Sequence, residues 1–368
     1  MNQPNEAPIA VVIGTRPEGI KLLPLVQAMR EEGLSPYTVV SGQHGMLLAE
    51  VFGAFGETPS LCLPPLCFGE DLSALICHLV AALSDTFRRV RPCLVILQGD
   101  TATAYAAALS AFLLRIPILH VEAGLRSGDP YSPFPEESLR RQIAAMALLH
   151  IAPTREAMEH LLCEGIPRAR VFLLGNTVED ALRLLLPKRQ GISSTVVFTL
   201  HRREHSERVM REIFGAVRAF SERHPELKIL YPVHPSARVR RVAEDAFRGV
   251  SGVRLSAPMG VREFYAALSA APLVMTDSGG VQEEAALLGI PTLVLRENTE
   301  RESELRSGDI CLGGTEAARI LSLAEKLLAT PRKIKGKSRR GSPSKEICKV
   351  ILAFKAGGFD MPPLFRES

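Results

Sequence analysis

Residues 93–124 read CLVILQGDTATAYAAALSAFLLRIPILHVEAG and contain an apolar run, a stretch with helical periodicity and a second apolar run. The runs at 93–99 and 116–124 are rich in aliphatic residues and have no polar alternate face, which is typical of strands buried on both sides. The stretch at 102–114 between them favours a helix. A strand, a helix and a strand in this order predict two parallel strands joined by a right-handed crossover.

The same alternation extends along the chain. Further apolar runs occur at 10–14, 171–175, 195–200, 228–233, 272–280 and 291–295, and helix-period segments at 17–31, 136–149, 207–223, 262–271 and 281–289. A chain of 368 residues is too long for one core and suits two domains of about 150–200 residues each. The pattern restarts after residue 175. We therefore predict an α/β protein of two doubly wound, Rossmann-like domains, 1–175 and 176–343, joined by a linker over 176–194, with a last helix within 344–368 that returns to the first domain.

The composition excludes several classes of protein. Apolar residues make up 46% and charged residues 23% of the chain, as in globular proteins. The longest apolar runs are too short to span a bilayer, and the N-terminus lacks the basic region of a signal peptide, so a cytoplasmic location is expected. The seven cysteines form no Cys-x-x-Cys pair, which indicates reduced thiols and no metal site.

The net charge of +4 has one source, the segment 331–345 (PRKIKGKSRRGSPSK), with seven Lys and Arg residues and no acid. It could be a patch that binds nucleic acid or an anionic membrane, or a solvated linker. No aromatic residue that could stack on a base interrupts it, so we favour the linker and predict neither a nucleic-acid nor a membrane partner.

Candidate ligand-binding residues follow the predicted strands, at the edge where open α/β sheets bind ligands. In TDSGG, Asp277 or Ser278 can cap the next helix, and Gly279 and Gly280 let its free amides approach a phosphate. Glu284, one turn later, could accept hydrogen bonds from ribose hydroxyls. The string could also be an ordinary glycine-rich turn. Neither GxGxxG nor a Walker lysine occurs, which argues against a nicotinamide cofactor and ATP hydrolysis.

The first predicted strand ends in GTRPEGIK. Arg16 and Lys21 at this helix entry suit an anionic ligand such as a diphosphate, although both could be surface charges.

Acidic residues collect after three other segments. Asp100 follows the run at 93–99, Glu122 lies in HVEAG, and Glu136 opens a predicted helix. Carboxylates at neighbouring strand ends repel, so at least one should keep its proton near neutral pH, as acid–base catalysis requires. Asp100 could instead cap a helix and Glu136 could serve a helix dipole. Glu122 needs a partner, for which Arg126 is one candidate.

Two histidines follow strands of the second predicted domain. His201 in HRRE can transfer a proton near neutral pH or bind a phosphate. His234 in YPVH holds the equivalent place after the next strand, where a structural role is equally consistent with the sequence.

In combination, nine strings resemble one known family, the non-hydrolysing UDP-N-acetylglucosamine (UDP-GlcNAc) 2-epimerases. They are GTRPEGIK, SGQH, QGDTATAYAAALSAF, IPILHVEAGLRSGDPYSPFPEE, LLGNTVEDAL, HRRE, YPVH, TDSGGVQEEAALLGIPTLVLR and NTER, in family order within residues 13–301.

The resemblance implies a GT-B-type fold with a UDP-sugar in the cleft between the domains, UDP on the second domain and the sugar facing the first. It also implies inversion at C2 of UDP-GlcNAc through a 2-acetamidoglucal, no metal or other cofactor, and a homodimer. The matching catalytic positions are Asp100, Glu122, Glu136 and His201, and the matching substrate-binding positions are Arg16, Lys21, His44, His234, Phe264, Ser278, Gly279, Gly280, Glu284 and Arg301.

The chain also departs from the family pattern, at Gly45-Met46, Leu139, His205 and Glu302-Ser303. The first departure lies where many members bind a second, activating UDP-GlcNAc. Four functions therefore remain open: the epimerase, an epimerase of a modified UDP-HexNAc, a hydrolysing enzyme that releases ManNAc and UDP, and a UDP-sugar-binding protein with impaired chemistry. Pro17-Glu18 favours the non-hydrolysing branch.

Overall fold

The structure is a computed structural model that describes residues 7–43, 45–65, 71–187, 191–200, 206–234, 236–299, 305, 308–330, 332 and 341–357. Its contacts divide the chain into unit 1, which comprises Met1–Leu184 and Arg339–Ser368, and unit 2, Leu185–Ser338. Both units contain a parallel sheet with helices between successive strands, so the predicted α/β class is confirmed. The boundary lies nine residues beyond the expected one at 175, and unit 1 includes both ends of the chain.

The sheet of unit 1 has seven strands in the order β3-β2-β1-β4-β5-β6-β7, all paired in parallel. In chain order they are β1 (Ile9–Ile13), β2 (Pro36–Val40), β3 (Leu61–Cys62), β4 (Leu94–Gln98), β5 (Ile118–Val121), β6 (Leu149–Ala152) and β7 (Val171–Leu173). Every residue of β1 and β4 is buried, as their uninterrupted apolar runs predicted.

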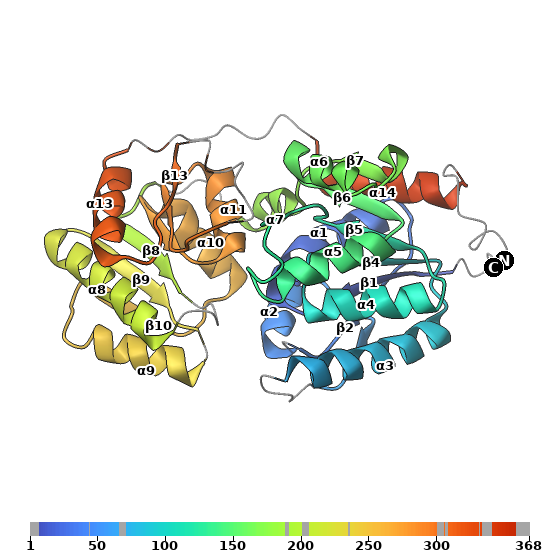
Figure 1. The fold of residues 1–368 in the computed structure, drawn as a ribbon, viewed down its shortest axis with the longest axis horizontal. Helices are drawn as coiled ribbons and strands as arrows, with labels where there is room; N and C mark the ends of the chain where they lie inside the picture. Colours follow the sequence, from blue (N-terminus) through green and yellow to red (C-terminus); the bar gives the residue numbers. More distant parts are fainter. Residues whose placement is uncertain are drawn as a thin grey trace. The chain divides into compact units, whose positions relative to one another are not determined.

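The helices of unit 1 cover both faces of this sheet (Figure 1). They are α1 (Arg16–Glu31), α2 (Gly45–Phe55), α3 (Leu72–Val90), α4 (Ala102–Leu113), α5 (Glu136–Met146), α6 (Arg155–Cys163), α7 (Val178–Leu185) and α14 (Pro343–Lys355), with a 3-10 turn at Arg168–Arg170. Residues of α3, α4 and α5 share one core with alternate residues of β1 and β4. Helix α5 ends before the predicted limit of 149, because Ala147 is extended (ψ 142°) and Leu149 begins β6.

The direction of winding changes between β1 and β4, which are neighbours in the sheet although two strands separate them in sequence. Ligands of doubly wound sheets bind beyond the carboxyl ends of such a strand pair. The turn after β1 is packed tightly there, since a Cβ on Gly14 would lie 2.1 Å from Thr103 Oγ1. Glycine at 14 therefore lets α4 approach this turn.

Two elements join the ends of unit 1. Helix α7 occupies part of the predicted linker 176–194, because its buried Val178, Ala181, Leu182 and Leu185 form an apolar stripe at helical spacing. Asp180 accepts a hydrogen bond of 2.8 Å from Ser344 N in the first turn of α14. Helix α14 (red in Figure 1) also packs on α1, and Lys345 forms an ion pair of 3.0 Å with Glu31.

Unit 2 has a six-stranded parallel sheet in the order β10-β9-β8-β11-β12-β13. Its strands are β8 (Thr195–Thr199), β9 (Lys228–Pro232), β10 (Val253–Ser256), β11 (Val274–Thr276), β12 (Thr292–Val294) and β13 (Ile310–Leu312), and its helices are α8 (Glu207–Arg223), α9 (Ala237–Ala246), α10 (Val261–Ala270), α11 (Gly279–Leu288) and α13 (Ala317–Leu328). Apolar residues of α8, α9 and α13 form one core with the sheet. The winding changes between β8 and β11, and none of the helices in the described ranges is long and apolar enough to cross a membrane.

The basic segment 331–345 is not simply a solvated linker. Arg332 is half-buried and donates to the carbonyl oxygens of Ser269 (2.7 Å) and Leu288 (3.3 Å), in the last turns of α10 and α11. A cation at a helix C-terminus satisfies free carbonyls and the negative end of the dipole. Residues 333–340 lie outside the described ranges, and α14 begins at Pro343.

We expect Arg332→Met to lower the free energy of unfolding of unit 2 by about 2 kcal/mol, because two charge-assisted hydrogen bonds to helix ends are lost. Urea denaturation measures this. The control is Arg319→Met, which removes an exposed arginine bonded to the single carbonyl of Leu312 and should change stability by less than about 0.5 kcal/mol. Equal midpoints for the two variants would show that Arg332 does not stabilise α10 and α11.

Candidate functional site

Glu122 is the most constrained acid at the carboxyl edge of unit 1. It follows β5 with a φ of +61°, a conformation that a glutamate rarely adopts, and is 6% exposed. Its Oε2 lies 2.5 Å from Nζ of Lys21 on α1 and also accepts from Nε2 of Gln98 at the end of β4. Backbone strain of this kind persists where the surrounding structure overdetermines it, which is common at functional sites.

This ion pair changes two expectations. Lys21, which the sequence analysis assigned to a diphosphate, is itself buried and lies against a carboxylate. Arg126, considered as the partner of Glu122, instead forms a bidentate ion pair with Glu164, at 2.7 Å from Nε and 2.6 Å from Nη2. The third cation, Arg16, is half-buried at the first position of α1.

Asp100 lies at the end of the neighbouring strand β4 and is oriented by a buried arginine. Nε of Arg140, on α5, donates to Asp100 Oδ2 at 2.9 Å, and its Nη2 donates to the same oxygen. Nη1 of Arg140 donates to Glu137 at 3.2 Å. Asp100 is not the cap of α4, because Thr101 fills that role by accepting from Ala104 N at 3.0 Å.

Glu136 and Glu137 begin α5 but lie in different surroundings. Glu136 is half-buried, whereas Glu137 is fully buried and accepts from Ser127 N at 3.0 Å as well as from Arg140. Glu137 therefore fixes the loop that precedes α5 and the arginine that holds Asp100. Glu137 and Arg140 were not predicted as site residues, although their i, i+3 spacing on a helix is a usable signal for such a pair.

Glu18 is a further acid that the sequence analysis did not select. Its Oε2 accepts from the amides of Gly14 and Thr15, both at 2.6 Å, and its Oε1 from Thr101 Oγ1 at 2.5 Å. Burial raises the pKa of Glu18 from 4.5 to about 7, although these hydrogen bonds lower it. Repulsion between carboxylates was expected to keep one acid at this edge protonated. For Glu18 the main cause of the raised pKa is burial.

His120 and His150 form a buried pair on adjacent strands. They are partners in the register of β5 and β6. Burial lowers the pKa of His120 to about 4 and that of His150 to about 3. The neighbouring charges of Arg126 and Arg140 lower the pKa of His120 further, while Glu122 opposes this. Both rings are therefore neutral near pH 7.

The two rings should accordingly make unit 1 less stable in mild acid. Glu18 acts in the opposite direction between about pH 7 and pH 4.5, because its raised pKa lets the folded state bind a proton that the unfolded state lacks, and it offsets about one ring. A histidine whose pKa falls on folding contributes its full stabilisation above its unfolded pKa of about 6.5 and loses it as the pH falls toward the folded value. Between pH 6 and pH 4 we expect each ring to remove up to about 1.4 kcal/mol per pH unit. Urea denaturation across this range measures the slope. It should be shallower in His150→Leu, and an unchanged slope would contradict the assignment to His150.

The carboxyl edge of unit 2 presents the start of α11. Ser278 is the cap of this helix, with its Oγ 3.5 Å from Val281 N, whereas Asp277 is fully buried at the end of β11. A Cβ on Gly280 would meet only Ser278 Oγ, at 3.9 Å, so the first turn is open to a ligand. Its free amides and the positive end of the helix dipole suit a phosphate.

Glu284 lies in the second turn of α11 and is buried. Tyr265 of α10 donates its hydroxyl to Glu284 Oε1 at 2.8 Å. Phe264, the neighbour of Tyr265, is half-buried, and His234 after β9 is exposed, with its Nδ1 accepting from Ser236 N at 3.2 Å. His44, His201 and Arg301 lie outside the described residues, so the structure places eleven of the expected site residues, five in unit 1 and six in unit 2.

The departure at Leu139 lies in α5, between Glu137 and Arg140 in the sequence. Leu139 is buried, and its amide donates to Pro135 O at 3.1 Å. An apolar packing residue therefore stands at this departure, and the next residue, Arg140, bonds to Asp100 and Glu137. The departures at His205 and at 302–303 lie outside the described residues, as does the side chain of Met46.

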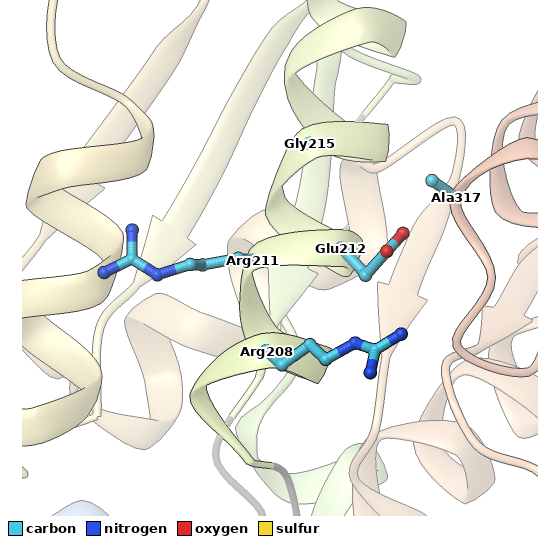
Figure 2. Close-up of a pocket in the computed structure, with 5 residues that line it drawn as sticks. All are labelled: Arg208, Arg211, Glu212, Gly215 and Ala317. Carbon is cyan, nitrogen blue, oxygen red and sulfur yellow. The ribbon is translucent and has the colours of Figure 1, made fainter.

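An open hollow on unit 2 contains none of the expected site residues. It is lined by Arg208, Arg211, Glu212, Gly215 and Ala317, and Figure 2 shows Arg211 pointing to the opposite side of α8 from Arg208 and Glu212. The three charged side chains are exposed and do not converge on one point. In the described parts of the chain no group of three or more His, Cys, Asp or Glu residues could hold a metal ion.

Comparison with known proteins gives consistent matches along the chain. A family model described as UDP-N-acetylglucosamine 2-epimerase matches residues 27–352. The UDP-N-acetylglucosamine 2-epimerase of Bacillus subtilis is 37% identical over 346 residues, 91% of this chain and 90% of that protein.

Solved structures agree with the sequence matches. The UDP-GlcNAc 2-epimerase of Neisseria meningitidis bound to UDP-GlcNAc is similar with a TM-score of 0.85 and 31% identity, over 94% of this chain and 99% of that one. The MnaA–UDP structure from S. aureus gives a TM-score of 0.88 and 33% identity, over 97% and 99% of the two chains.

Proposed function

Because the chain belongs to the UDP-N-acetylglucosamine 2-epimerase family, we propose that it interconverts UDP-GlcNAc and UDP-N-acetylmannosamine (UDP-ManNAc) by inversion at C2. The fold is of the GT-B type that its structural neighbours share. The observation that supports the reaction most directly is the buried Lys21–Glu122 pair beside Asp100, at the strand ends where unit 1 changes its winding.

The proposed chemistry is an elimination followed by an addition. A carboxylate of unit 1 takes the proton from C2 while the C1–O bond breaks, so that UDP leaves with the bonding electrons and a 2-acetamidoglucal remains. Return of a proton to the opposite face of C2 and attack of UDP on C1 complete the inversion. The C2 proton is weakly acidic, so positioned bases and cations that stabilise developing charge are both required.

The acids of unit 1 are held in position for the proton transfer at C2. Lys21 holds Glu122 in one position, and Arg140 directs the carboxylate of Asp100. We assign proton transfer at C2 to Glu122, Asp100 and Glu136. We propose that His201, which matches a catalytic position of the family, assists. Arg16 supplies positive charge for the diphosphate.

We propose that unit 2 holds UDP. The diphosphate would lie at the first turn of α11, formed by Ser278, Gly279 and Gly280, where amides and the helix dipole converge. Glu284 would accept hydrogen bonds from the ribose hydroxyls, and Phe264 would pack near the uracil. Arg301, His44 and His234 complete the proposed substrate-binding set by family resemblance.

Tyr265→Phe should raise the dissociation constant of UDP about tenfold, because Glu284 loses the hydroxyl that orients it for the ribose. Isothermal titration calorimetry measures the constant. The control is Tyr105→Phe in α4 of unit 1, which should bind UDP as the wild type does. Equal affinities for Tyr265→Phe and the wild type would remove Glu284 from the proposed ribose site.

The reaction itself is tested with purified protein and UDP-GlcNAc in D2O, with the C2 proton followed by NMR. Deuterium at C2 together with UDP-ManNAc supports the proposal. Free ManNAc and UDP would instead identify a hydrolysing enzyme. Absence of exchange despite tight UDP binding would reject UDP-GlcNAc as the substrate, and the same assay with modified UDP-HexNAc substrates would then separate an altered specificity from a binding protein.

A further inference from the structure

His120 is a buried histidine that the proposed chemistry does not use. It is 1% exposed on β5, two residues before Glu122. Its Nε2 lies 2.8 Å from the carbonyl oxygen of Gly99. A carbonyl oxygen only accepts hydrogen bonds, so Nε2 carries the hydrogen, and the neutral ring has its lone pair on Nδ1. Among the described residues Nδ1 has no hydrogen-bond partner.

Gly99 is the residue that turns the chain from β4 toward Asp100. It has a φ of +71°, and its amide donates to Val121 O at 3.1 Å. Both polar groups of the Gly99 backbone are therefore bonded to consecutive residues of β5, His120 and Val121, and the next residue is Glu122.

Gly99 has no close neighbour on the side where a Cβ would project. A Cβ built on Gly99 would meet no atom within 4 Å, in contrast to Gly14, which lies against Thr103. The backbone of Gly99 is consequently held by its two hydrogen bonds, while Arg140 and Glu18 bond to the next two residues, Asp100 and Thr101. Of the two bonds at Gly99, only the one from His120 involves a side chain, so a substitution can remove it.

We propose that His120 is a positioning residue that sets the place of Asp100 relative to Glu122. The inference rests on the proposed function, because it assumes that both carboxylates act on one sugar. His120 connects the strand that carries Glu122 to the turn that carries Asp100, while Arg140 orients the Asp100 carboxylate from α5. A shift of about 1 Å in a catalytic group can cost a hundredfold in rate.

The surroundings of His120 keep its ring neutral. The charged groups that act on it are Glu122, Arg126 and Arg140, and His150 faces it from β6. Burial and the two arginines hold its pKa near 4, so the ring stays neutral while the enzyme works. His120 acts through the backbone of Gly99, and its effect should appear in kcat and not in the pH dependence.

The test compares His120→Met with His120→Gln. Methionine fills the space but cannot donate to Gly99 O, whereas the amide of glutamine can take the place of Nε2–H. We expect His120→Met to lower kcat for epimerisation about 10–100-fold with KM within twofold, and His120→Gln to keep kcat within about threefold. His150→Gln, a control at the buried register partner, should leave kcat within twofold. If His120→Met does not fold, His120→Asn, whose amide is too short to reach Gly99, replaces it.

Hydrogen exchange measured on the same proteins does not depend on activity. The amide of Gly99 should exchange at least tenfold faster in His120→Met than in the wild type, and at the wild-type rate in His120→Gln. If the wild type does not epimerise but Gly99 still exchanges faster in His120→Met, the proposed function is rejected, while the role of His120 in holding Gly99 is kept. Three outcomes would overturn the inference: unchanged kcat in His120→Met, equal losses in the methionine and glutamine variants, or a shifted pH profile in His120→Gln.

Discussion

Glu122→Gln is expected to slow deuterium exchange at C2 of UDP-GlcNAc by at least about a thousandfold while leaving the dissociation constant of UDP within twofold. The amide has nearly the shape of the carboxylate but cannot take a proton. Glu122 is not among the residues proposed to contact UDP, so the two measurements separate chemistry from binding.

The control for this variant is Glu164→Gln, a second glutamate of unit 1 in an ion pair with an arginine. Glu164 bonds to Arg126, and among the described residues it bonds to none of the proposed catalytic set, so the exchange rate of Glu164→Gln should stay within twofold of the wild type. Normal exchange in Glu122→Gln would assign the proton transfer to another carboxylate, and Asp100 would then be the first to replace.

Lys21→Met should destabilise unit 1 by about 3–5 kcal/mol, the cost of leaving one member of a buried ion pair without its partner. Both side chains are nearly inaccessible to water, at 5% for Lys21 and 3% for Glu122. Epimerisation should also fall sharply, because Glu122 loses the contact that holds it. Urea denaturation at pH 7 measures the first effect and the D2O assay the second.

The double variant Lys21→Met/Glu122→Gln separates the ion pair from other packing effects. With no charge left at either position, the double variant should be more stable than the sum of the two single losses predicts. The difference should be about 1 kcal/mol or more, which is typical of residues in contact. The control is Lys345→Met, which breaks the exposed pair with Glu31 and should cost less than about 1 kcal/mol. Additive losses would show that Lys21 and Glu122 do not stabilise each other.

Local sequence pattern was enough to predict the fold class, because strands buried on both faces have uninterrupted apolar runs. It also located α8 at its observed limits, 207–223. The prediction of helix limits was wrong where no glycine or proline separates a helix from the next strand. The apolar residues of α5 continue without glycine or proline into β6, so the predicted helix ran to 149 although α5 ends at Met146.

The contacts of the site were harder to predict than its residue types. Lys21 and Glu122 are 101 positions apart, and they meet because the winding of unit 1 brings α1, β4 and β5 to one edge. Proximity in sequence suggested Arg126 instead, which contacts Glu164. Burial is likewise a property of the whole fold, so the raised pKa of Glu18 could not be read from GTRPE.

The return of α14 to unit 1 has a consequence for biosynthesis. A ribosome makes β1 first, yet the helix that packs on α1 and bonds to Asp180 is translated only after all of unit 2. Domains generally fold as they emerge during synthesis. Unit 2 can therefore complete its fold while the nascent unit 1 still exposes the surface that Ile347, Cys348 and Ile351 later cover.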